Sequence, residues 1–207
     1  MIRVRGVDKA FGDKTVLHGI DAAFDAGQVN FIIGRSGSGK SVLTKCIVGL
    51  LEVDAGSIHY AGADFTLLTA KEREEIRLQI GMLFQGGALF DSLTVLENVE
   101  FPLKMFTSMG PEERMERAME CLKRVQLEGA EHRYPAEVSG GMQKRVALAR
   151  AIVGRPRYLF CDEPNSGLDP QTAIVIDNLI RDLTQEYNTT TVVISHDMNS
   201  VIEIGDN

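Results

Sequence analysis

The stretch "VNFIIGRSGSGKSVLTKCIVGL", residues 29–50, decides the fold. It opens with a short apolar run, passes through a loop of glycine and serine, and continues as an apolar helical pattern. The loop "GRSGSGKS" matches G-x-x-x-x-G-K-[ST], which holds phosphates when it lies between a strand and a helix. Its glycines let backbone N–H groups wrap phosphates, while Lys40 can reach the β- and γ-phosphates and Ser41 can bind Mg²⁺. The predicted phosphate-binding residues are Gly34, Arg35, Ser36, Gly37, Ser38, Gly39, Lys40 and Ser41.

The rest of the chain alternates between strand and helix patterns. The apolar runs "YLFCDE" (158–163) and "TTVVIS" (190–195) are typical of strands buried on both faces of a parallel sheet. Near the N-terminus apolar and polar residues alternate instead, which indicates antiparallel strands. Residues 112–127 have helical spacing, and Asp169-Pro170 is a typical helix start. We therefore predict an α/β fold with a P-loop core, a mostly parallel sheet and an antiparallel β subdomain.

One domain accounts for all 207 residues. Residues 1–85 and 157–207 are predicted to form the nucleotide-binding core, and residues 86–156, rich in helix signals, an inserted helical lobe. The net charge is −7, so nucleic acid is not an expected partner. Three scattered cysteines and the lack of a long apolar run predict a soluble protein of a reducing cytosol.

Adjacent carboxylates close the run "YLFCDE". Behind a phosphate loop, Asp162 is expected to hold Mg²⁺ and Glu163 to act as general base on the attacking water. His196 follows another apolar run, at the strand end where α/β sheets place ligands. Gln85 likewise ends the apolar run "IGMLFQ". These positions predict one site at a shared edge of the sheet.

A second helix start is unusual. In "PAEVSGGMQKR", residues 135–145, Ser139 is a good N-cap, but Gly140 and Gly141 each disfavour a helix by about 1 kcal/mol. Glycines are tolerated there when backbone N–H groups must lie bare against an anion. The chain is therefore predicted to carry two anion-binding helix starts.

Six motifs, in this order, resemble those of the nucleotide-binding domains of ABC transporters. They are the loop at 34–41 (Walker A), Gln85, "VSGGMQKR", "YLFCDEP" (Walker B), "SGLD" at 166–169 and His196. The resemblance covers essentially the whole chain. It departs from the commonest LSGGQ motif, because Met142 stands where glutamine is usual.

The resemblance also implies roles for individual residues. Phe11 would stack on adenine, and Gln85 would sense Mg²⁺ or the attacking water and couple the site to the membrane partner. Asp169 would cross a dimer interface, and His196 would contact the γ-phosphate. Two copies would pack head to tail, each ATP lying between one copy's P-loop and the other's Ser139–Gly141.

The implied function is an ATPase that uses ATP and Mg²⁺ to power a transmembrane permease from the inner face of the plasma membrane. The segment 84–103 resembles the Mla-type branch, which moves phospholipid across the bacterial envelope, with a lipid-binding companion. Two alternatives stay open: the ATPase of another importer, for example of an amino acid, or a regulatory ATPase on a membrane partner. A chromosome-organising ATPase is disfavoured, because no room remains for a long coiled coil.

The chain stops at "EIGDN", residues 203–207. Members of that family usually continue through another strand and a C-terminal segment. We therefore expect a truncated C-terminal end and a sheet that lacks an edge element.

Overall fold

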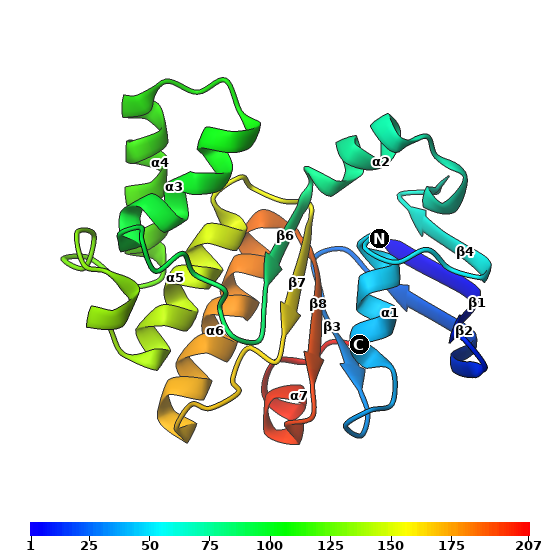
Figure 1. Ribbon diagram of the computed structural model, residues 1–207. Coiled ribbons are helices and arrows are strands. Elements are labelled where there is room, and N and C mark those ends of the chain that lie inside the picture. Colours follow the sequence, from blue (N-terminus) through cyan, green and yellow to red (C-terminus); the bar gives the residue numbers. More distant parts are fainter.

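A four-stranded parallel sheet forms the centre of the protein, whose computed structural model describes residues 1–207 (Figure 1). Its strand order is β3 (Val29–Ile33), β8 (Thr190–Ser195), β7 (Tyr158–Asp162) and β6 (Ile80–Leu83). β8 is wholly buried and β7 nearly so, as expected for strands covered on both faces. The predicted α/β class with a mostly parallel sheet is confirmed.

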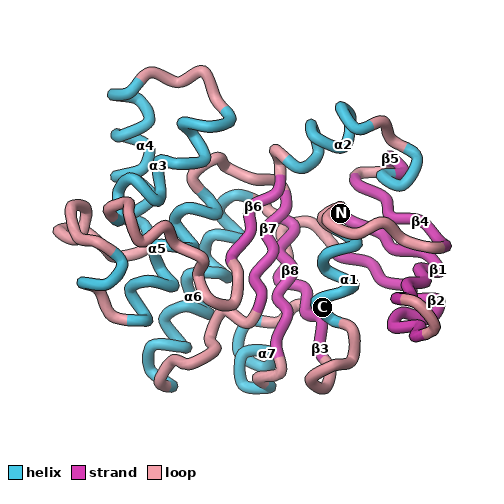
Figure 2. The backbone as a smooth tube through the Cα atoms, viewed as in Figure 1, coloured by secondary structure: helices cyan, strands magenta, loops and turns pink.

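A second, antiparallel sheet lies beside the first. Its order is β2 (Lys14–Phe24), β1 (Ile2–Phe11), β4 (Ala55–Tyr60) and β5 (Ala63–Asp64). Helix α1 (Lys40–Ile47) lies between the two sheets (Figures 1 and 2). Cys46 and Ile47 of α1 share one apolar cluster with Ile2 of β1 and Phe160 of β7. The helix that follows the phosphate loop therefore joins the two sheets.

Helices α5 (Gly140–Ile152) and α6 (Pro170–Tyr187) cover the other face of the parallel sheet (Figure 1). The expected apolar stripe of α6, with Ile176, Ile180 and Leu183, is buried there. A short helix, α7 (Met198–Ile204), follows β8.

Helices dominate the segment 86–156, the inserted helical lobe of the sequence prediction. It contains α3 (Val95–Phe106), α4 (Pro111–Arg124), the 3₁₀ turn Pro135–Glu137 and α5. The helix α2 (Ala70–Arg77) and a 3₁₀ turn at Phe65–Leu67 precede it. α3 and α4 project from the body of the molecule (Figure 2). α5 belongs to both parts, because Leu148 and Ile152 lie in the same buried cluster as Val193 of β8.

The last two residues pair with the outer edge of β3. The Phe31 amide donates to the carbonyl oxygen of Asn207 at 2.8 Å, and the Asp206 amide donates to that of Val29 at 3.0 Å. None of the helices combines the length and apolar character needed to span a membrane.

Candidate nucleotide site

The phosphate loop turns directly into α1. Gly39 caps that helix with φ 97°, a left-handed conformation that glycine adopts without steric cost. Ser36, Gly37 and Ser38 are exposed. The Lys40 side chain lies over the loop, and its ammonium donates to the carbonyl oxygens of Gly34 at 2.7 Å and Arg35 at 3.2 Å. The loop therefore presents backbone N–H groups and one cation to the same space.

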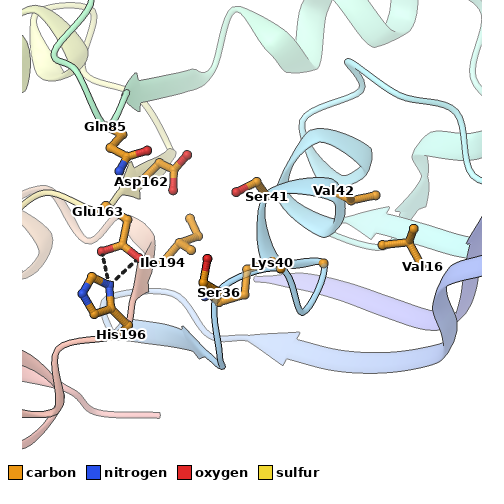
Figure 3. A pocket seen from close by; sticks show the side chains of 12 residues that line it. Val16, Ser36, Lys40, Ser41, Val42, Gln85, Asp162, Glu163, Ile194 and His196 are labelled. Carbon is orange, nitrogen blue, oxygen red and sulfur yellow. Dashed lines mark hydrogen bonds and ion pairs between the residues drawn. The ribbon is translucent and has the colours of Figure 1, made fainter. Parts of the chain in front are cut away.

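A cavity of about 450 Å³ opens in front of this loop (Figure 3). The loop and α1 face the ends of the parallel strands across it, and Gln85, Asp162 and Glu163 point in from the far side. Nine of the residues that the sequence singled out line the cavity: Ser36, Gly37, Gly39, Lys40, Ser41, Gln85, Asp162, Glu163 and His196. Three apolar residues that were not predicted from the sequence line it too: Val16, Val42 and Ile194.

Glu163 is fixed in an unusual backbone conformation at the end of β7. Its φ is +48°, a region that costs a non-glycine residue about 1–2 kcal/mol. Such outliers persist where the surroundings determine them, often at functional sites. Its carboxylate accepts from His196 Nδ1 at 2.8–2.9 Å, and its side chain is 15% exposed against 71% for His196. The histidine therefore orients a carboxylate that is itself largely covered.

Oxygen atoms from three elements face the cavity where Mg²⁺ is expected. Ser41 comes from α1, Gln85 from the loop after β6, and Asp162 from the end of β7. Burial, and next the neighbouring Glu163, raise the pKa of Asp162, while Lys40 lowers it. Hydroxyl, amide and carboxylate oxygens suit a small hard cation that also binds substrate phosphates. The donor set therefore fits Mg²⁺.

The second helix start that was predicted to bind an anion lies elsewhere on the chain. Ser139 caps α5, its Oγ accepting from the Met142 amide at 3.2 Å, and Ser139 and Gly140 are exposed. The first N–H groups of a helix have no carbonyl partner within it. No part of Ser139–Gly141 lines the cavity in front of the phosphate loop. The start of α5 therefore faces outward.

Asp169 lies next to that helix start. A Cβ built on Gly141 would stand 2.5 Å from Thr172 Cγ2, so the first turns of α5 and α6 are in close contact. Asp169 caps α6, accepting from the Thr172 hydroxyl at 2.6 Å and from two amides at 3.1 Å. These bonds, the Thr172 hydroxyl first, lower the pKa of Asp169. Thr172 thus links the ionised Asp169 carboxylate to the glycines that begin α5.

Phe11 is not among the residues that line the cavity. It ends β1 with 48% of its surface exposed, and the Lys9 ammonium lies 5.7 Å from its ring centroid. Stacking on adenine stays a prediction.

Two cations on α5 were not predicted from the sequence. Lys144 is 7% exposed and donates to the carbonyl oxygen of Gln85, and Arg150 donates to those of Gly87 and Ala88. Burial lowers the pKa of Lys144, whereas Asp162 and Glu163 raise it. A usable signal was present, because Lys144 shares its helical spacing with the apolar Ala147 and Leu148.

Comparison with known proteins agrees with this geometry. The family profile described as "ABC transporter" matches residues 17–166. The chain is 41% identical over 206 residues to the probable ribonucleotide transport ATP-binding protein mkl of Mycobacterium leprae, covering 100% of this chain and 59% of that protein. It is 40% identical over 206 residues to the methionine import ATP-binding protein MetN of Rhizobium johnstonii, covering 100% and 57%. The chain thus spans less than two thirds of these relatives.

A solved structure is similar throughout. The dimeric structure of MJ0796, a bacterial ABC transporter cassette, matches with a TM-score of 0.89 and 35% identity, over 99% of this chain and 91% of that one. A dimeric post-hydrolysis state of the same cassette, bound to ADP and Pi, matches with a TM-score of 0.87 and 36% identity, with the same coverage. The fold, the order of the motifs and these matches agree: the chain belongs to the ABC transporter family.

Proposed function

We propose that this chain is an ATP-binding and ATP-hydrolysing subunit of an ABC transporter, which works as a head-to-tail pair around two ATP molecules. One observation carries the proposal. The chain has a cavity with Lys40 and Glu163, and it also has a glycine-rich helix start, Ser139–Gly141, with Ser139 and Gly140 exposed, that takes no part in that cavity. A second copy can bring its Ser139–Gly141 to the open side of the cavity and complete the site.

The residues divide the work of hydrolysis among them. Lys40 and the loop amides would hold the β- and γ-phosphates, and Ser41, Gln85 and Asp162 would hold Mg²⁺, which neutralises developing phosphate charge. Glu163 would take a proton from the attacking water while the bond between the γ-phosphorus and its bridging oxygen breaks, giving ADP and phosphate. His196 would hold the Glu163 carboxylate in place and face the γ-phosphate.

The rate of ATP hydrolysis tests this function. Because each site needs two chains, the rate per chain is expected to rise with protein concentration below the dimer dissociation constant. Phosphate release with ATP and Mg²⁺ measures the rate over a series of dilutions. A rate per chain that does not change on dilution would show a site complete within one copy, and no hydrolysis at any concentration would contradict an ATPase.

A second cavity fits the membrane partner. It has a volume of about 810 Å³ and a mostly apolar lining from α2, β6, the loop after β6, α3 and α5. The Phe90 and Phe101 rings meet there with centroids 4.6 Å apart, and Phe106 is 64% exposed. Phe84 and Ala88 of its lining flank Gln85 in sequence. We propose that a permease docks in this groove and acts on the nucleotide site through Gln85.

Phe106→Glu is expected to abolish permease binding and to leave ATP binding unchanged, because it places a charge in an apolar groove. Affinity capture from detergent-solubilised membranes, read by mass spectrometry, measures binding of a multi-span protein. Leu67→Glu is the matched control, since Leu67 is 83% exposed and lies outside the groove. Equal recovery of the permease by both variants would refute this docking site.

The names of the similar proteins indicate which kinds of substrate the transporter could carry. Their names, ribonucleotide transport and methionine import, give no support to phospholipid transport or to a lipid-binding companion. They favour the alternative, the ATPase of another importer. We therefore propose an importer subunit held at the membrane by its permease. Uptake of labelled methionine and of a ribonucleotide by cells with and without this chain tests the two candidates, and lipid movement alone would revive the phospholipid hypothesis.

A further inference from the structure

The loop after β6 is held against helix α5 by two cationic side chains. Lys144 donates to the carbonyl oxygen of Gln85, while Arg150 donates through Nη1 to that of Ala88 and through Nη2 to that of Gly87, both at 2.7 Å. These three carbonyls lie within four consecutive residues. The two cations stand less than two helical turns apart. One helix therefore holds the loop backbone at Gln85, Gly87 and Ala88.

The loop backbone is shaped for this grip. Gly87 has φ 74° and Ala88 has φ 47°, so two consecutive residues are left-handed. Gly87 is buried, and a Cβ at that position would lie 3.7 Å from the Ala147 Cβ on α5. The Arg150 guanidinium also lies 5.9 Å from the Phe90 ring centroid. A strained conformation of this kind persists only where surrounding contacts determine it.

The same helix begins at Ser139–Gly141. α5 thus carries at its N-terminus the anion-binding amides, and along its length the cations that hold the loop of Gln85. In the proposed dimer, Gln85 acts in the chain's own nucleotide site, whereas Ser139–Gly141 acts in the site of the second copy. A shift of the Gln85 loop would carry the start of α5 with it.

We propose that Lys144 and Arg150 are positioning residues that make the Gln85 loop and the start of α5 move as one unit, so that each chain couples its own nucleotide site to the site it completes in the second copy. The inference rests on the proposed function, and it adds a route between the two sites. The permease groove borders this unit, because Phe90 and Arg150 also line that groove.

Pairs of chains with one hydrolytic site test the coupling. A chain with intact Glu163 is mixed, before ATP and Mg²⁺ are added, with a large excess of the Glu163→Gln chain, and phosphate release is followed over a single turnover. Lys144→Met is placed either in the intact chain, where it frees the Gln85 loop of the active site, or in the excess chain, where it frees the α5 that completes that site. Because misplacement by about 1 Å can cost up to about 100-fold, we expect about a tenfold slower release in both arrangements.

The outcomes are separable. If release is slower in the first arrangement alone, Lys144 acts only on its own chain's site and the proposed coupling is overturned. No change of rate in either arrangement would also overturn it. No release from the unsubstituted reference pair would instead refute the proposed function. ATP affinity is expected to stay unchanged throughout, which a general loss of folding would not allow.

Matched variants keep the test specific. Arg145→Met is the control, because Arg145 Nη1 on the same helix donates to the carbonyl oxygens of Gln126 at 3.0 Å and Val125 at 3.3 Å, away from the Gln85 loop. It is expected to release phosphate at the reference rate. Lys144→Arg keeps a donor and is expected to restore most of the rate. If Lys144→Met does not fold, Arg150→Lys takes its place with the same expected outcomes. This variant keeps the charge but loses the pair of hydrogen bonds that the guanidinium donates to Gly87 and Ala88.

Discussion

Glu163→Gln is expected to slow ATP hydrolysis by about 10²- to 10⁴-fold, the usual contribution of a general base. The amide has the same size and still reaches His196, but it cannot take the proton of the attacking water. ATP binding should persist, because Lys40 and the phosphate loop are unchanged. Single-turnover phosphate release, with ATP affinity measured in parallel, separates the two effects.

Two other carboxylates provide comparison variants for that experiment. Glu203→Gln removes an exposed carboxylate on α7, outside the cavity, and should hydrolyse ATP at the unsubstituted rate. Asp162→Asn removes a proposed Mg²⁺ ligand and should instead weaken Mg²⁺ binding, so that hydrolysis needs a higher Mg²⁺ concentration. If Glu163→Gln kept more than about a tenth of the rate, the general base would have to be another group.

Lys40→Ala is expected to weaken ATP binding by about 10- to 150-fold, because a hydrogen bond to a charged group contributes about 1.5–3 kcal/mol. The ammonium already lies over the loop, within 3.2 Å of two of its carbonyl oxygens, and needs only a small shift to reach phosphate. Isothermal titration with ATP and Mg²⁺ measures the change.

Lys45→Ala provides the control for Lys40. Lys45 lies in the last turn of the same helix, is exposed and does not line the cavity. Its substitution should leave ATP affinity nearly unchanged. Equal losses in the two variants would point to general electrostatic attraction rather than to a contact of Lys40 with phosphate.

The central part of the fold could be predicted because its signals are local. Residues 29–50 contain strand, loop and helix in one unbroken pattern, and Asp169-Pro170 begins a helix as expected. Asp162 ends one parallel strand and His196 follows another. The carboxyl ends of these strands meet at one edge of the sheet, so the fold class predicted that both residues would line one cavity.

Contacts between distant residues could not be predicted in the same way. Lys144 and Gln85 are 59 positions apart, and their bond depends on how α5 packs beneath the loop. The sequence placed Gln85 at the end of a strand, whereas β6 stops at Leu83 and leaves Gln85 in the loop. The boundary between the predicted helical lobe and the core could not be placed from the sequence either. The helical spacing of α5 does not show whether this helix packs against the lobe or against the parallel sheet.

The sedimentation of Glu163→Gln at saturating ATP tests most directly whether two copies share each nucleotide. With ATP and Mg²⁺ we expect a particle of twice the chain mass. With ADP we expect a single chain, because ADP lacks the γ-phosphate that the second copy's Ser139–Gly141 would bind. A single chain at every ATP concentration that saturates the site would contradict it.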